Sequence, residues 1–202
     1  TAGTSNYIAG VNAGNSIASG GNYNVAIGDE AGTAITTGDD NTFVGYASGD
    51  ATTTAANNTA VGSNALGANT EGHSNTALGT SAASAITTGD YNVAIGRNSL
   101  DACTTADNNV AVGWTSLGAN TTGASNTAVG GDAMAANTTG TNNVAFGTGT
   151  LVANTTANSN TAVGQAALAA NTTGTQNTAL GALALDAAVT VNNNTAIGYN
   201  AL

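Results

Sequence analysis

Residues 58–74 read NTAVGSNALGANTEGHS, and Asn75 then begins a closely similar segment. The opening motif is Asn-(Thr/Val)-Ala-(Val/Ile/Leu)-Gly, with Phe replacing the usual residue once in each of two columns. A fixed period of 17 residues, kept over most of the chain, is the signature of a solenoid of stacked, near-identical coils. The sequence therefore predicts an all-β fold, a parallel β-solenoid of the β-roll or β-helix type, with about twelve coils. The regular copies of the motif begin at Asn24, Asn41, Asn58, Asn75, Asn92, Asn109, Asn126, Asn143, Asn160, Asn177 and Asn194, and a less regular copy begins at Asn6.

The composition excludes several classes of partner. Only 6% of the 202 residues are charged, against about 25% in an ordinary globular domain. Arg97 is the one basic residue, and the formal net charge is -10. Nucleic acids and anionic membrane surfaces both need clustered Lys and Arg, so we expect neither as a partner. No stretch approaches the roughly 20 apolar residues of a membrane span, so no membrane insertion is expected.

One coil is expected to open with a short strand. Side chains alternate between the faces of a strand, so Thr59 and Val61 share one face and Asn58 and Ala60 the other. Because the Val61 column is apolar in every regular repeat, the Thr59 and Val61 face is predicted to point inward. The Ala60 column would then form a smooth apolar stripe outside, broken only by Phe43, and such a stripe usually marks a partner surface.

The rest of the coil is expected to bend back toward the strand. The spacing of Ala65, Leu66 and Ala68 fits a tight bend or one short helical turn. Asn69-Thr70-Glu71-Gly72 then forms a turn, because Asn and Gly accept positive φ.

A compensation between columns indicates which positions share the core. Most repeats carry Leu or Met at the eighth position after the Asn, as Leu66 does, and usually Asn at the eleventh. Where the eighth residue is small, an Ile usually stands at the eleventh; the coil of Gly49, which has Thr52 there, is the exception. Both positions are therefore predicted to reach the same interior space, where a methyl-sized void costs about 1 kcal/mol. The exchanged pairs are Gly14 with Ile17, Gly32 with Ile35 and Ala83 with Ile86.

The repeated Asn is predicted to form a structural ladder. Identical side chains stacked one layer apart commonly bond to each other as amide ladders. The ladder is expected to contain Asn58, Asn75, Asn92, Asn109, Asn126, Asn143, Asn160 and Asn177.

No group of residues stands apart from the repeat as a catalytic, cofactor or metal site. The glycine spacings lack the Lys of a phosphate loop. His73 has no Cys or His partner at ligand spacing and is expected in an exposed turn, while Cys103 is expected as a small core thiol. The chain is accordingly predicted not to be an enzyme and to need no cofactor. The carboxylates considered for calcium, and interpreted as solvated surface charge because no Asp recurs in every coil, are Asp29, Glu30, Asp39, Asp40, Asp90 and Asp107.

Paired Thr residues in the turn favour a rival function. Thr occupies the twelfth and thirteenth positions of nearly every coil, and a regular outward rank of Thr could order water and bind ice. Only one of the two columns could lie on a given face, with Asn as its companion, so the expected surface is an Asn-x-Thr ladder. Its Thr residues are Thr122, Thr139, Thr156 and Thr173, and Asn120, Asn137, Asn154 and Asn171 of the same segments also match glycosylation sequons.

The repeat resembles known fibre proteins. The unit from Asn160 to Gln176, which closes on Asn177, is similar to repeats of proteins described as tail-fibre-domain proteins of phages and bacteria. The segments Val93–Ser99 and Thr59–Ala65 also resemble the head repeats of trimeric autotransporter adhesins, which are parallel β-rolls with a shorter coil. The resemblance covers residues 24–202 and implies an elongated fibre in which three chains associate side by side.

The sequence divides into two parts. Residues 1–23 are expected to form an irregular first coil or a cap, and residues 24–202 one continuous solenoid. Because the chain begins with Thr and stops partway through a repeat, it is expected to be a fragment or processed segment of a longer protein.

These observations favour a structural or adhesive fibre shaft, located outside the cell, on the cell surface or on a virion. The expected partners are further copies of the chain, as a trimer or a filament, and a cell-surface receptor or glycan. Two alternatives stay open: an ice-binding solenoid and a self-assembling extracellular filament subunit.

Overall fold

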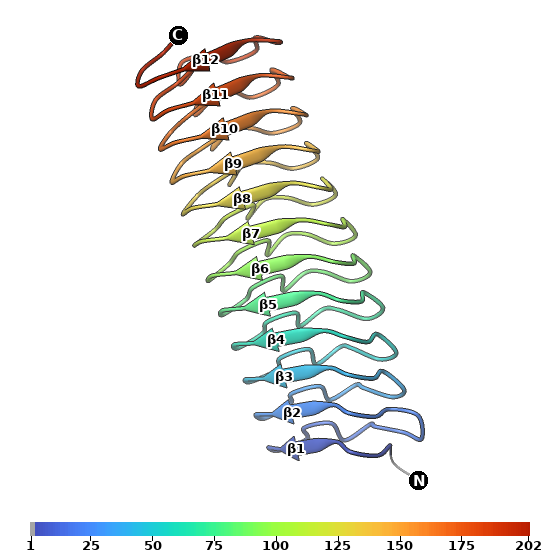
Figure 1. The fold of residues 1–202 in the computed structure, drawn as a ribbon. Helices are drawn as coiled ribbons and strands as arrows, with labels where there is room; N and C mark the ends of the chain where they lie inside the picture. Colours follow the sequence, from blue (N-terminus) through green and yellow to red (C-terminus); the bar gives the residue numbers. More distant parts are fainter. Residues whose placement is uncertain (1–2) are drawn as a thin grey trace.

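The computed structural model, which describes residues 3–202, is a single stack of coils that advances steadily from one end to the other (Figure 1). Twelve short parallel strands form one sheet in which the spatial order follows the sequence. The predicted parallel β-solenoid is confirmed. The strands are β1 (Tyr7–Ala9), β2 (Val25–Ile27), β3 (Thr42–Val44), β4 (Thr59–Val61), β5 (Thr76–Leu78), β6 (Val93–Ile95), β7 (Val110–Val112), β8 (Thr127–Val129), β9 (Val144–Phe146), β10 (Thr161–Val163), β11 (Thr178–Leu180) and β12 (Thr195–Ile197).

Equivalent residues of successive repeats pair directly. Thr59 lies opposite Thr76, and Ala60 lies opposite Ala77. Tyr7 pairs with Val25 across 18 residues, so the turn before β2 accommodates the extra residue and keeps the strands in register. Residues 3–23 thus form a first coil that carries β1, while residues 1 and 2 of the predicted first segment lie outside the described residues.

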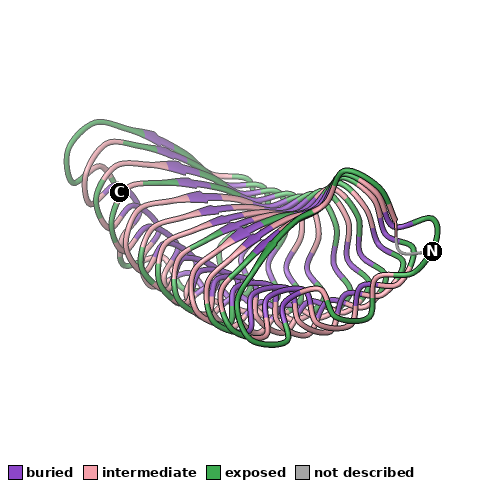
Figure 2. Ribbon diagram, turned by 90° about the horizontal axis from the view of Figure 1, so that it is seen from below, coloured by how far each residue is buried: buried purple, intermediate pink, exposed green. Residues whose placement is uncertain are grey.

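The two faces of the sheet are reversed relative to the sequence prediction: the face predicted to point inward points outward. Ala60 is completely buried, whereas Thr59 is exposed and Val61 is only half-buried. The same pattern recurs along the stack, where the middle residue of each strand from β2 to β12 is buried (Figure 2). The prediction was wrong because the Asn at the start of each coil must point inward to form its hydrogen bonds. Ala60, two residues after Asn58, then shares the inner face, and the large apolar residues are turned outward.

The segment after the strand makes tight turns, and no helix forms among the described residues. Asn64 and Leu66 have φ of 56° and 55°, in the left-handed region that a right-handed helix excludes. Of the two alternatives left open by the spacing, the tight bend is the one observed.

The position that ends each strand favours glycine for two reasons: its backbone φ is positive, and the next coil lies too close for a side chain. Gly62 has a φ of +136°, and a Cβ atom there would lie 2.5 Å from the carbonyl oxygen of Gly79 in the next coil. An L-residue would therefore be strained and would also push the coils apart.

The eighth and eleventh positions share the core, as the compensation indicated. Leu66 and its equivalents up to Leu168 are fully buried, whereas Leu202 in the last coil is exposed. A Cβ atom on Gly32 would lie 2.7 Å from Cδ1 of Ile35, so the Ile fills the space that the missing Leu leaves.

Phe43 explains the one coil that has a small residue at the eighth position and no Ile at the eleventh. The prediction that Phe43 interrupts an outer stripe was wrong, because its ring is fully buried. A Cβ atom on Gly49 would lie 2.6 Å from three atoms of that ring. Phe43 therefore fills the volume that Leu fills elsewhere, and Thr52 beside it does not need to.

We predict a strong coupling between positions 43 and 49. Phe43→Ala should lower the free energy of unfolding by about 3–5 kcal/mol because it opens a cavity. Gly49→Leu alone should also destabilise, because the new side chain overlaps the ring. The double variant restores the usual Ala and Leu pair and should recover most of the loss, as measured by urea denaturation. Two effects that simply add would contradict the account.

Candidate functional site

The buried face of the sheet carries a continuous ladder of Asn side chains. Oδ1 of Asn126 accepts the backbone N–H of Asn143 at 3.0 Å and its Nδ2 at 3.1 Å. Nδ2 of Asn143 also donates to the carbonyl of Ala157, on the opposite side of the same coil, at 2.8 Å. The amides therefore join each coil to the preceding one, and most of them also hold the turn layer against the sheet. All eight predicted ladder residues are at most 1% exposed, and Oδ1 of each accepts the backbone N–H of the next Asn. Nδ2 of Asn109 is the exception to the bond across the coil, because it donates to Asn92 and to the carbonyl of Asp107.

A second ladder, which the sequence analysis did not foresee, runs through the eleventh position of the later coils. Nδ2 of Asn137 donates to Oδ1 of Asn120 at 2.8 Å, and Asn154 bonds to Asn137 at 2.7 Å. The ladder continues to Asn171, whose Oδ1 is buried and has no hydrogen-bond partner. The next coil has Ala188 at this position, so no amide is available to donate to that oxygen.

We predict that Ala188→Asn stabilises the protein. The new Nδ2 group would donate to Oδ1 of Asn171, so that a buried acceptor gains its missing bond. The free energy of unfolding should rise by about 1–2 kcal/mol, with a matching rise in the thermal midpoint followed by circular dichroism. The matched control is Ala187→Asn, which adds the same amide at an exposed neighbouring position. If both substitutions changed the free energy of unfolding equally, the stabilisation would not come from a bond to Oδ1 of Asn171.

The outer face of the sheet is a second candidate surface. We define it as the first and third residues of strands β2 to β12, from Val25 and Ile27 to Thr195 and Ile197. It contains only Thr, Val, Ile, Leu and Phe and has no charged residue. The third residue is 47% exposed at Leu78 and 56% exposed at Phe146, and it reaches 69% at Ile197 in the last strand. Their hydropathy alone predicted these residues inside, but the hydrogen-bond geometry of the Asn turns them outward.

The two Thr columns of the turn have different environments. The hydroxyl of Thr138 donates to the carbonyl of Thr155 at 3.0 Å, so the first column is engaged in bonds between coils. The second column, which includes the predicted residues Thr122, Thr139, Thr156 and Thr173, is exposed.

The expected Asn companion of this second column is not on the surface. Asn120, Asn137, Asn154 and Asn171 are buried in the second ladder, so the predicted Asn-x-Thr surface is wrong. A strand-like alternation was assumed there, whereas this segment turns and directs the amides inward. Burial also makes these four sequons inaccessible in the folded chain.

Four of the acidic side chains, Asp29, Asp39, Asp90 and Asp107, accept backbone N–H groups of the preceding coil. Oδ1 of Asp107 accepts the N–H of Asp90 at 2.8 Å, and Oδ1 of Asp90 accepts that of His73 at 2.6 Å. His73, exposed as expected, accepts the N–H of Ala56 through Nδ1 at 3.0 Å. Within residues 3–202, no three His, Cys, Asp or Glu side chains come together as a metal site would require.

Cys103 lies in the core column that Ile35 and Ile86 fill in other coils. Its Sγ donates to the carbonyl of Ala106 at 3.8 Å. Burial raises the pKa of the Cys103 thiol to about 11, so the group is neutral at physiological pH and is a poor nucleophile. Partial burial also raises the pKa values of the Asp50 and Asp101 carboxyls above their usual 3.8.

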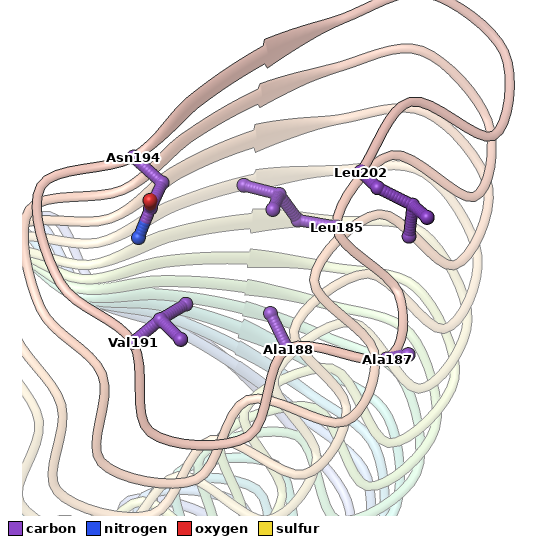
Figure 3. A pocket seen from close by; sticks show the side chains of 6 residues that line it. All are labelled: Leu185, Ala187, Ala188, Val191, Asn194 and Leu202. Carbon is purple, nitrogen blue, oxygen red and sulfur yellow. The ribbon is translucent and has the colours of Figure 1, made fainter.

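A cavity of about 250 Å³ opens at the last coil (Figure 3). Its walls are core columns: Leu185 and Leu202 occupy the eighth position, and Ala188 occupies the eleventh. In every earlier coil the following coil covers these positions. The cavity is thus the uncovered end of the core rather than a separate site. Its lining residues are Leu185, Ala187, Ala188, Val191, Asn194 and Leu202.

These features define the class of protein, a parallel β-solenoid repeat protein with a polar inner ladder and an apolar outer face. No protein-family model, curated protein or solved structure matches the chain. Among the described residues, no helix has the length and apolar character needed to cross a membrane.

Proposed function

We propose that this chain is the shaft of a structural or adhesive fibre that acts outside the cell or on a virion. The observation that carries the proposal is the outer face, which runs without a charge along the sheet from β2 to β12. Continuous apolar surfaces of this kind usually mark a partner site on a soluble protein. A repeated coil also makes a rod whose length is set by the number of repeats.

The partner that best fits this face is another copy of the chain. Eleven strands spaced about 4.8 Å apart, each about 10 Å long, make a face on the order of 500 Å². This is less than the roughly 800 Å² that each partner contributes to a standard interface. If three copies packed around a common axis, the outer face of each copy would contact both of its neighbours, and the assembly would be closed. The area of the face does not set the number of copies; we favour a trimer because it closes and is the state that the resemblance implies, with the outer face as its interface in place of the Ala60 column that the sequence suggested.

We predict that a charge on the outer face separates the copies. Val112→Glu places a carboxylate on the half-buried last residue of β7, near the middle of the stack, and should reduce the mass measured by light scattering from about three times 19.2 kDa to that of one chain. The control is Thr122→Glu, which adds the same charge to the exposed Thr column and should leave the assembly intact. A wild-type chain that is monomeric at micromolar concentration would contradict the proposal. Electron micrographs of the same sample would distinguish discrete rods from the open filaments that end-to-end stacking produces.

An ice-binding role is the second candidate. It is favoured by the exposed single file of Thr122, Thr139, Thr156 and Thr173, which repeats at the spacing of one coil. Thermal hysteresis that disappears in Thr139→Lys, while the mass of the assembly stays unchanged, would support this role over the shaft. Absence of thermal hysteresis in the wild-type protein would contradict the ice-binding role.

A further inference from the structure

The only tryptophan of the chain, Trp114, lies in the turn that directly follows strand β7. Arg97, Trp114 and Gly131 follow the strand-ending glycine in three consecutive coils, so they form one column. The N–H of Thr115 bonds to the carbonyl of Arg97 at 3.1 Å, and the N–H of Asp132 bonds to that of Trp114 at 2.9 Å. Trp114 is 55% exposed. A large apolar ring in contact with water is therefore held on a rigid, regular backbone.

On the side of Trp114 away from Arg97, the next position of the column is a glycine, Gly131, and carries no side chain. A Cβ atom on Gly131 or on Gly149 would meet no atom within 4 Å, whereas glycines inside the stack would meet a close neighbour. These two glycines adjoin each other, because the N–H of Gly149 donates to the carbonyl of Gly131 at 3.0 Å. We call this bare backbone surface the glycine ledge. It leaves room for a flat group beside the indole.

Polar groups border the glycine ledge. One carboxylate oxygen of Asp132 accepts the hydroxyl of Thr115 at 2.6 Å, which fixes the position of the side chain. The second oxygen keeps lone pairs that accept strongly from a ligand hydroxyl. Thr148, which follows Gly131 in the column, is exposed and offers a further hydroxyl. An aromatic face with a few fixed polar groups is the usual composition of a small-molecule site.

We propose that Trp114 and the glycine ledge bind a neutral sugar ring. The apolar C–H face of the ring would pack on the indole, while its hydroxyls bond to Asp132 and Thr148. An acidic sugar fits less well on the ledge, because Asp132 borders it and the chain has a net charge of -10, while Arg97 lies on the other side of Trp114, away from Gly131. The inference deepens the adhesive part of the proposed function by naming the receptor class, a glycan.

The single tryptophan makes the test direct, since all indole fluorescence comes from Trp114. Titration with glucose, galactose, N-acetylglucosamine, N-acetylgalactosamine and their short oligomers should give a saturable blue shift with at least one of them. The expected Kd is roughly millimolar, as suits one ring on one aromatic group. Gly131→Val fills the ledge but keeps the reporter, and should weaken binding at least about tenfold. The backbone of Gly131 is outside the positive-φ region, so Val is tolerated there.

The control is Ala182→Val, which adds the same branched side chain to the same column three coils further on and should bind like the wild type. The titration is repeated with Val112→Glu, so that failure of the sugar site and failure of assembly are told apart. No saturable shift with any of these sugars would overturn the proposal, as would equal binding by Gly131→Val. A stronger response to glucuronic acid than to glucose would overturn the choice of a neutral ring.

Discussion

The inward-pointing Asn at the start of each coil is the constraint from which the rest of this structure follows. Its amide bonds to the Asn of the preceding coil and to a carbonyl across its own coil, as in Asn160 with Asn143 and Gly174. These bonds are buried, where an unpaired amide would destabilise the fold by about 1–3 kcal/mol. Once the Asn faces inward, strand alternation places Ala beside it and turns the larger apolar residues outward.

This arrangement explains why hydropathy misled the choice of face. The period, the position of the strands and the shared use of the eighth and eleventh positions could all be predicted, because they depend on repetition within one chain. The choice of face depends instead on hydrogen-bond geometry, which a column of Val, Ile and Leu does not reveal. The sequence did contain one indication of the correct face. Phe43 replaces Ala in the one coil where neither Gly49 nor Thr52 fills the core, so the large ring is needed inside. Phe43 and its equivalent Ala60 therefore belong to the inner face.

The reversal of the two faces also changes what the surface can do. A smooth Ala stripe would offer little apolar area, whereas the observed outer face presents β-branched and larger residues in straight columns. The candidate sugar site escaped sequence analysis for a different reason. Trp114 is informative only beside the bare backbone of Gly131 and Gly149, and the open space around a glycine is a property of the folded chain.

The central claim is that the buried amide ladder is required to hold the coils in register. The most direct measurement is the free energy of unfolding of Asn143→Ala compared with Thr156→Ala, with hydrogen exchange read out in β9 and β10. Removal of the amide leaves the N–H of Asn160 and the carbonyl of Ala157 without these bonds, so a loss of about 3 kcal/mol or more is predicted, with faster exchange in both strands. The exposed Thr156 should tolerate replacement. A value for Asn143→Ala within about 0.5 kcal/mol of the wild type would contradict the account.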